Sequence, residues 1–212
     1  MGSGSNTPEQ RRYDEIIQKP VCRYDDDIIQ KPVLYLYPEE ATDVTVKLNF
    51  KKTKFSCVYP NFNEKKNSWK VRACPNGEIL ISDKKYPYLF WEAYSYNRQD
   101  LSKGFIVKAE NAQQFLDKKL KILGLDDKES ADFITFWLPV LIKNKISLCS
   151  FQTQQFFDNF EYNITPKPKT FIRVFLSIKK LDKEIEVERQ ELKNVRREGF
   201  TAVEWGGSEV KS

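Results

Sequence analysis

The chain has 212 residues, of which 40% are apolar and 14% aromatic, and this composition excludes an intrinsically disordered or fibrous protein. It contains no histidine, which excludes Ser-His-Asp and Cys-His triads and HExxH metalloproteases, because the side chain that titrates near neutral pH is missing. The net charge is +5, from 35 basic and 30 acidic residues that are interleaved along the chain, so the sequence does not favour a nucleic-acid partner.

Neither the cysteines nor the glycines form a recognisable ligand-binding motif. Cys22, Cys57, Cys74 and Cys149 lack the short spacing of a zinc site, and no glycine-rich loop is placed to cradle a phosphate. We therefore expect no metal and no cofactor. The sequence has no run of about 18 apolar residues, and its N-terminus lacks the apolar core of a signal peptide. These features predict an intracellular, cytoplasmic protein without a membrane span.

The N-terminal region carries a short duplication. The octapeptide DEIIQKPV at residues 14–21 recurs as DDIIQKPV at residues 26–33, with one conservative difference. Two copies at so short a period indicate a local duplication rather than a repeat architecture. The first copy is either a tail without function or a docking peptide that presents Ile16 and Ile17 to a partner.

Short apolar strands begin directly after the second copy. Residues 33–37, VLYLY, indicate that the folded domain starts near Lys31. In residues 42–50 apolar and polar side chains alternate, which is the period-2 signature of a half-buried strand. Gly77 can take the positive φ that a tight hairpin requires. Together with the short strands, this turn predicts an antiparallel meander for the first half of the chain. The further strands expected in it are 55–59, 69–73, 78–82 and 88–94.

The apolar period then becomes helical. Asn111 is placed to cap a helix that Gly124 ends, and Asp126 with Glu129 resembles the capping box of a second helix. We expect Pro139 to break or kink this second helix. Together the two helices predict a helical hairpin.

Further strands are expected on both sides of the hairpin. They are residues 104–108 before it and 146–151, 160–164, 171–178, 184–188 and 200–205 after it. A helical pair within a long series of strands is typical of the α+β class. The predicted fold is a mostly antiparallel β-sheet or sandwich with an inserted helical hairpin.

Two glutamates are candidates for carboxylate chemistry. Glu92 in YLFWEAYSY and Glu204 in VEWGG are flanked by aromatic residues on which a sugar ring can stack. Glycosidases use two carboxyl groups about 5–9.5 Å apart, one as acid and the other as nucleophile or base. The alternative is that each glutamate pairs with a lysine or arginine while the aromatic residues belong to the core.

Aromatic residues also suggest a recognition surface, because tyrosine and tryptophan combine a large contact area with few rotatable bonds. The alternative for them is packing in the core or on a sheet face. With Ile16 and Ile17, the residues that we predict to bind a partner are Tyr88, Trp91, Tyr94, Tyr96 and Trp205.

Five long stretches of the sequence are distinctive: KPVLYLYPEEATDVTVKLNF (31–50), YPYLFWEAYSY (86–96), GLDDKESADFITFWLP (124–139), PKPKTFIRVFLSIKKLD (166–182) and REGFTAVEWGG (197–207). Together they resemble an uncharacterised family of bacterial and protist proteins that carry a KPVIYLYP opening and a GFTVVEWGG ending. The resemblance implies one domain over residues 31–207, with tails at 1–30 and 208–212. It implies no particular activity.

From these observations we predict a non-catalytic protein-interaction or structural module whose strand edges and tyrosines bind a protein partner. The alternative hypothesis is a carboxylate-dependent glycan hydrolase or lyase that uses Glu92 and Glu204, or a glycan-binding module without a catalytic pair. The enzyme and the binding-module hypotheses require different geometries. An enzyme needs both carboxylates in one open pocket, whereas a binding module needs an exposed aromatic patch or an unpaired strand edge.

Overall fold

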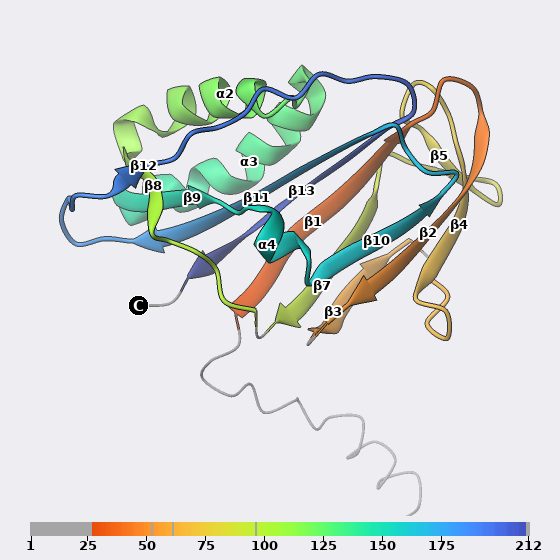
Figure 1. Cartoon of the computed structure of the whole chain (residues 1–212), viewed down its shortest axis with the longest axis horizontal. Helices are drawn as coiled ribbons and strands as arrows, with labels where there is room; N and C mark the ends of the chain where they lie inside the picture. Colours follow the sequence, from red (N-terminus) through yellow and green to blue (C-terminus); the bar gives the residue numbers. More distant parts are fainter. Residues whose placement is uncertain (1–26, 52, 61, 96, 211–212) are drawn as a thin grey trace, which may run out of the picture.

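A computed structural model of the chain describes residues 27–210 with gaps at residues 52, 61 and 96 (Figure 1). The fold is α+β, as predicted, with two sheets and a helical hairpin. The strands are β1 (Asp27–Tyr37), β2 (Thr42–Phe50), β3 (Thr53–Tyr59), β4 (Ser68–Ala73), β5 (Ile79–Ile81), β6 (Lys84–Tyr86), β7 (Leu89–Ser95), β8 (Lys103–Lys108), β9 (Ile146–Phe151), β10 (Phe160–Thr165), β11 (Thr170–Lys180), β12 (Glu188–Arg189) and β13 (Thr201–Val210). The helical elements are the 3-10 turn η1 (Ala109–Asn111), α2 (Ala112–Ile122), α3 (Asp127–Asn144) and α4 (Gln154–Phe157).

The larger sheet has eight strands in the order β12-β8-β9-β11-β13-β1-β7-β3. Most neighbours are antiparallel, but β11 and β13 are parallel along their whole length, which places Arg173 beside Glu204. The strand β13 therefore lies in the interior of the sheet, between β11 and β1. The strand β3 forms one edge and pairs only with β7 among the described strands.

The smaller sheet has five strands in the order β10-β2-β4-β5-β6. Its strand β2 shows the predicted alternation, because Val44, Val46 and Leu48 are buried between more exposed neighbours. At the turn that precedes β5, Gly77 has a φ of +82°, as the hairpin requires. The meander predicted for the first half of the chain is thus divided between two sheets, with β1, β3 and β7 in the larger one.

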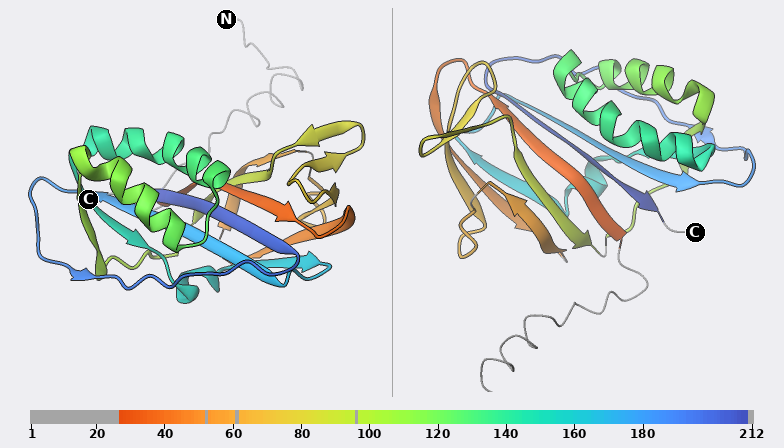
Figure 2. Two further views of the ribbon diagram at one scale, coloured as in Figure 1. Left: turned by 90° about the horizontal axis from the view of Figure 1, so that it is seen from above. Right: turned by 180° about the vertical axis from the view of Figure 1, so that it is seen from behind.

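Two apolar layers hold the fold together, one on each face of the larger sheet. The layer between the sheets contains the buried rings of Trp69, Trp91 and Phe160. The layer between the larger sheet and the helices is built around Trp137 and Trp205. Figure 2 shows α2 and α3 side by side on one face of the larger sheet, with the smaller sheet away from them.

The helix signals in the sequence correspond to the structure with two exceptions. The capping box is present: Glu129 N–H donates to Asp126 at 2.8 Å, and Asp126 N–H donates to Glu129 at 2.9 Å. Gly124 has a φ of +87° just after α2, as a helix-ending glycine should. Asn111 occupies the N-cap position of α2, but its side chain makes no capping hydrogen bond, because the backbone is already turning in η1; α3 continues through Pro139. Within residues 27–210, apart from the three gaps, no helix is both long and apolar enough to cross a membrane.

Element boundaries differ from the expected ones at both ends of the domain and near β12. The strand β1 begins at Asp27, because the second copy of the octapeptide already pairs with β7, and β13 extends to Val210. The strand expected at 184–188 is reduced to β12, which pairs with β8 at only two positions. The additional strand β6 pairs with β5.

Candidate functional site

The two candidate glutamates point to opposite faces of the larger sheet. Glu204 on β13 is in register with Leu34, which belongs to the layer between the sheets. Glu92 on β7 shares a face with Phe90, which packs against the layer beneath the helices. Because side chains alternate between faces along a strand, the sheet separates the two carboxylates. The structure does not bring them into one pocket as an acid and its nucleophile or base.

Glu204 belongs to a buried polar network that joins the two sheets. Tyr162 Oη on β10 donates to Glu204 Oε1 at 2.6 Å, and Arg173 Nε on β11 donates to Glu204 Oε2 at 2.5 Å. Trp91 Nε1 donates to the same tyrosine hydroxyl at 2.6 Å. The network therefore unites two residues that the sequence singles out, Glu204 and Trp91, through Tyr162.

Arg173 completes this network as the cation beside Glu204. Its side chain is 12% exposed and that of Glu204 is 7% exposed, so the ion pair is almost fully removed from solvent. The guanidinium carbon lies 4.3 Å from the ring centroid of Phe157, 5.1 Å from that of Tyr162 and 5.3 Å from that of Phe171. Both carboxylate oxygens of Glu204 are therefore engaged in the contact between the two sheets, one by Tyr162 and the other by Arg173.

Two buried tyrosine hydroxyls predict a loss of stability at high pH. The pKa of Tyr162 is raised well above its usual value, first by burial and then by the charge of Glu204. The pKa of Tyr35 is also raised, first by burial and then by a hydrogen bond of 2.8 Å to Asp132. Above the unfolded-state pKa of about 10, the unfolded chain loses these protons while the folded chain keeps them. The free energy of unfolding should therefore fall by about 1.4 kcal/mol per pH unit for each tyrosine.

An absorbance titration at 295 nm together with far-ultraviolet circular dichroism checks this result. Both hydroxyls should ionise only within the unfolding transition, and the variant Tyr162→Phe should show a shallower dependence of stability on pH. An unchanged slope in that variant contradicts the assignment of the high-pH loss to Tyr162.

Glu92 has a local structural partner on the other face of the sheet. Its Oε1 accepts a hydrogen bond of 3.2 Å from the backbone N–H of Lys31. Lys31 has a φ of 55° at an irregularity in the pairing of β1, and its Nζ lies 5.4 Å from the ring centroid of Tyr88 and 5.3 Å from that of Phe90. Glu92 and Tyr88 therefore both contact this irregular part of β1.

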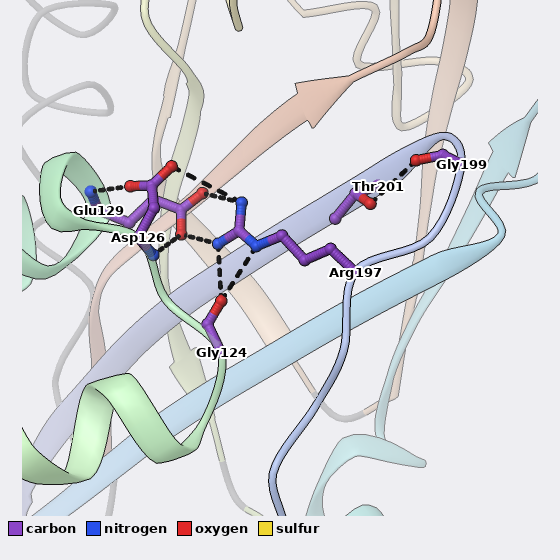
Figure 3. Close-up of polar contacts among 6 residues, drawn as sticks. All are labelled: Gly124, Asp126, Glu129, Arg197, Gly199 and Thr201. Atoms are coloured by element: carbon purple, nitrogen blue, oxygen red, sulfur yellow. Dashed lines mark hydrogen bonds and ion pairs between the residues drawn. The ribbon is translucent and has the colours of Figure 1, made fainter.

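A second, partly buried ion pair centres on Arg197, which follows β12 in a long extended segment (Figure 3). Its guanidinium donates to both carboxylate oxygens of Glu129, to one of them at 3.1 Å, and Nη2 donates to the carbonyl oxygen of Gly124 at 2.7 Å. Asp126 lies 3.6 Å away, and Glu129 is completely buried. Arg197 therefore fastens this segment to the capping box at the start of α3.

The structure places the predicted binding residues in three settings. Trp91 and Trp205 are 2% and 0% exposed, so their rings are part of the two apolar layers. Tyr88 and Tyr94 are partly exposed, and Tyr94 is in register with Lys54 on the face that carries Glu92. The remaining residues lie outside the described part of the chain: Tyr96, Ile16 and Ile17.

A groove of about 760 Å³ lies along β3, whose other edge has no strand beside it in the described part of the chain. Every residue of β3 lines it, together with Phe50, Phe62 and the loop after them. Phe55 and Phe62 form its apolar side, with ring centroids 5.9 Å apart. Tyr59 at the end of the strand is 58% exposed, the largest value among the exposed large hydrophobic residues that the structure describes.

Sequence reasoning did not assign the edge position of β3, the partner of Arg173 or the partner of Arg197. A strand at 55–59 is predicted, but its position at a sheet edge depends on pairing with β7, which is distant in sequence. The sequence does contain a signal for the ion pair of Arg173. A lone cation in the apolar strand FIRVFL indicates that a buried counterion lies beside it. The sequence contains no such signal for Arg197. Arg196 directly precedes it, and the two arginines look alike in a polar segment.

Among the described residues, no group of three or more cysteine, aspartate or glutamate side chains is arranged to hold a metal ion. Within the described residues, the structure provides a strand edge without a second neighbour beside an apolar groove. It also has two ion pairs, Arg173 with Glu204 and Arg197 with Glu129, that join segments distant in sequence. The chain matches no protein-family model, and comparison with curated proteins and with solved structures likewise found no match.

Proposed function

We propose that this chain is a non-catalytic protein-interaction module that binds an extended segment of a protein partner along the free edge of β3. The observation that carries the proposal is the combination of an unpaired strand edge with an apolar groove beside it. The backbone N–H and C=O groups of an edge strand can hydrogen-bond an added strand, and a neighbouring groove receives alternate side chains of that strand.

Tyr59 supports the proposal as an exposed aromatic anchor at one end of the groove. Its ring lies edge-on to that of Tyr86, with 5.6 Å between the centroids, so the phenol is positioned while most of its surface remains open. Large aromatic side chains held in this way contribute strongly to the binding energy of protein interfaces.

The edge also carries features that limit indiscriminate pairing. Lys54 is exposed within β3, and the register with β7 shifts between Phe55 and Cys57. Charged residues and bulges are the means by which natural edge strands avoid aggregation. Such an edge favours a partner that fits the groove over any exposed strand.

The proposal places the module in the cytoplasm. Cys57, Cys74 and Cys149 are free thiols, and Cys57 is exposed on the proposed binding strand. Free thiols persist in reducing compartments, whereas secreted domains of this size commonly pair theirs. A protein partner in the same compartment is therefore the expected ligand.

Replacing Tyr59 with serine should weaken partner binding by about 1–2 kcal/mol, or roughly tenfold, because the exposed ring is removed from the end of the groove. The full chain and the variant are purified from the native cells at near-physiological salt, and any partner is identified by mass spectrometry and then titrated against both.

Ile142→Ser is the matched control, because Ile142 is also exposed, at 53%, but lies on α3. A partner that is lost from the Tyr59 variant and retained by the Ile142 variant supports the proposal. A chain that purifies alone, or a partner retained equally by both variants, contradicts it.

A further inference from the structure

The duplicated octapeptide identifies a segment suited to the groove. Its second copy, residues 26–33, forms the first half of β1 from Asp27 onward, with Ile29 and Val33 buried. The first copy, residues 14–21, has the same sequence except for one acidic residue. A sequence that pairs as a strand in this domain is therefore present twice, and only the second copy is built into β1.

The entry point of the chain lies close to the free edge. Asp27 at the start of β1 is in register with Ser95 of β7, and Ser95 is in register with Thr53 at the start of β3. The chain before Asp27 thus begins at the end of the sheet where β3 also begins. Adjacent strands are about 4.8 Å apart, so a position beyond β3 is about 14 Å from β1.

The strand directions and the length of the connection both suit the first copy. Since β1 and β3 are each antiparallel to β7, they run in the same direction. A segment that precedes Asp27 and folds back beside β3 therefore runs antiparallel to it, the geometry of a hairpin-like addition. Residues 22–26 connect this position to β1, and the steps from residue 21 to residue 27 span about 20 Å when extended, which exceeds the distance required.

We infer that residues 14–21 are a ligand of the β3 groove in the same chain, an inference that rests on the groove of the proposed function. Neighbouring side chains of an added strand point to opposite faces, so one of Ile16 and Ile17 enters the groove beside Phe55 and Phe62. The partner segment that the groove accepts is then an extended peptide of the type Ile-Ile-Gln-Lys-Pro-Val, and an external partner competes with the chain's own first copy.

Cys57 provides a native probe of this arrangement. It is exposed on β3 and is in register with Glu92, whereas Phe55 is in register with Ala93, so the thiol lies on the opposite face of the sheet from the ring of Phe55. In the full chain with Cys22→Ser, single cysteines are introduced in turn at residues 15–19, and the rate of disulfide formation with Cys57 is measured under mild oxidation. Alternate positions should cross-link about ten times faster than their neighbours, because disulfide geometry demands that both thiols share one face.

The variants that cross-link keep the isoleucine that enters the groove, so the test does not remove the contact that it examines. Cys57→Ser and Asn6→Cys, the latter outside the copy, are the controls. Equal rates at all five positions overturn the inference, because a tether without a fixed register gives no alternation. Cross-linked dimers in place of cross-linked monomers also overturn it, because they assign the segment to a second copy of the chain.

The outcomes distinguish this inference from the proposed function. If partner binding requires Tyr59 but the cross-linking rates are equal, the proposed interaction module is supported and the first copy is not its ligand. If the cross-linking rates alternate but Tyr59→Ser does not weaken partner binding, the intramolecular contact is established and the groove is not the binding site of the external partner.

Discussion

Arg197→Ala should lower the free energy of unfolding by about 3–5 kcal/mol, because it leaves the completely buried carboxylate of Glu129 without its cation. The variant also removes the donor to the carbonyl oxygen of Gly124, so the segment after β12 loses its attachment to the start of α3. For a domain of this size the expected fall in Tm is roughly 10 °C, measured by circular dichroism.

Arg196→Ala is the matched control, because Arg196 is exposed and has no ion pair among the described residues. Its effect should stay within about 0.5 kcal/mol. The double variant Arg197→Met with Glu129→Leu should regain part of the loss, since replacing both charges by apolar groups removes the unpaired carboxylate. If Arg196→Ala and Arg197→Ala destabilise equally, the ion pair with Glu129 does not stabilise the fold.

Glu204→Gln should cost about 3 kcal/mol, because it keeps the shape of the side chain but leaves the charge of Arg173 nearly buried and without a counterion. The loss is measured by urea denaturation, with the midpoint and the slope followed together. Glu209→Gln is the control, because Glu209 lies on the same strand but is exposed.

Removing the partner charge tests the cause of this loss. Arg173→Met alone should also destabilise the chain, and in combination with Glu204→Gln it should cost less than the sum of the two single effects, because the residues share one interaction. Additive losses contradict the coupling that the 2.5 Å contact between Arg173 and Glu204 implies.

The features that depend on neighbouring residues could be predicted from the sequence. The alternation in β2, the positive φ of Gly77 and the capping box of Asp126 and Glu129 each follow from a few adjacent side chains. The class α+β followed from combining such local signals, because the change of apolar period marks where strands give way to helices. Asn111 stands at the predicted N-cap position, but its side chain makes no capping hydrogen bond because the preceding residues already turn in η1, an effect of context beyond the capping residue itself.

The candidate site depended on contacts that no local pattern contains. Whether Glu92 and Glu204 share a face is decided by the register of β1 against both β7 and β13, and this register involves residues far apart in the sequence. The aromatic neighbours of Glu204 suggested a sugar platform, but Trp205 belongs to the core, as aromatic residues in apolar strands usually do. The edge position of β3 likewise emerged only from the order of all eight strands.

The interior position of β13 has a consequence for how the protein is made. Residues 201–210 fill the gap between β1 and β11, although they follow every other described strand in the chain. While a ribosome synthesises the chain, β1 and β11 emerge first and present unpaired apolar edges until β13 arrives. The larger sheet can therefore close only after residues 201–210 have been translated, so β1 and β11 lack their shared neighbour while all the preceding strands are being synthesised.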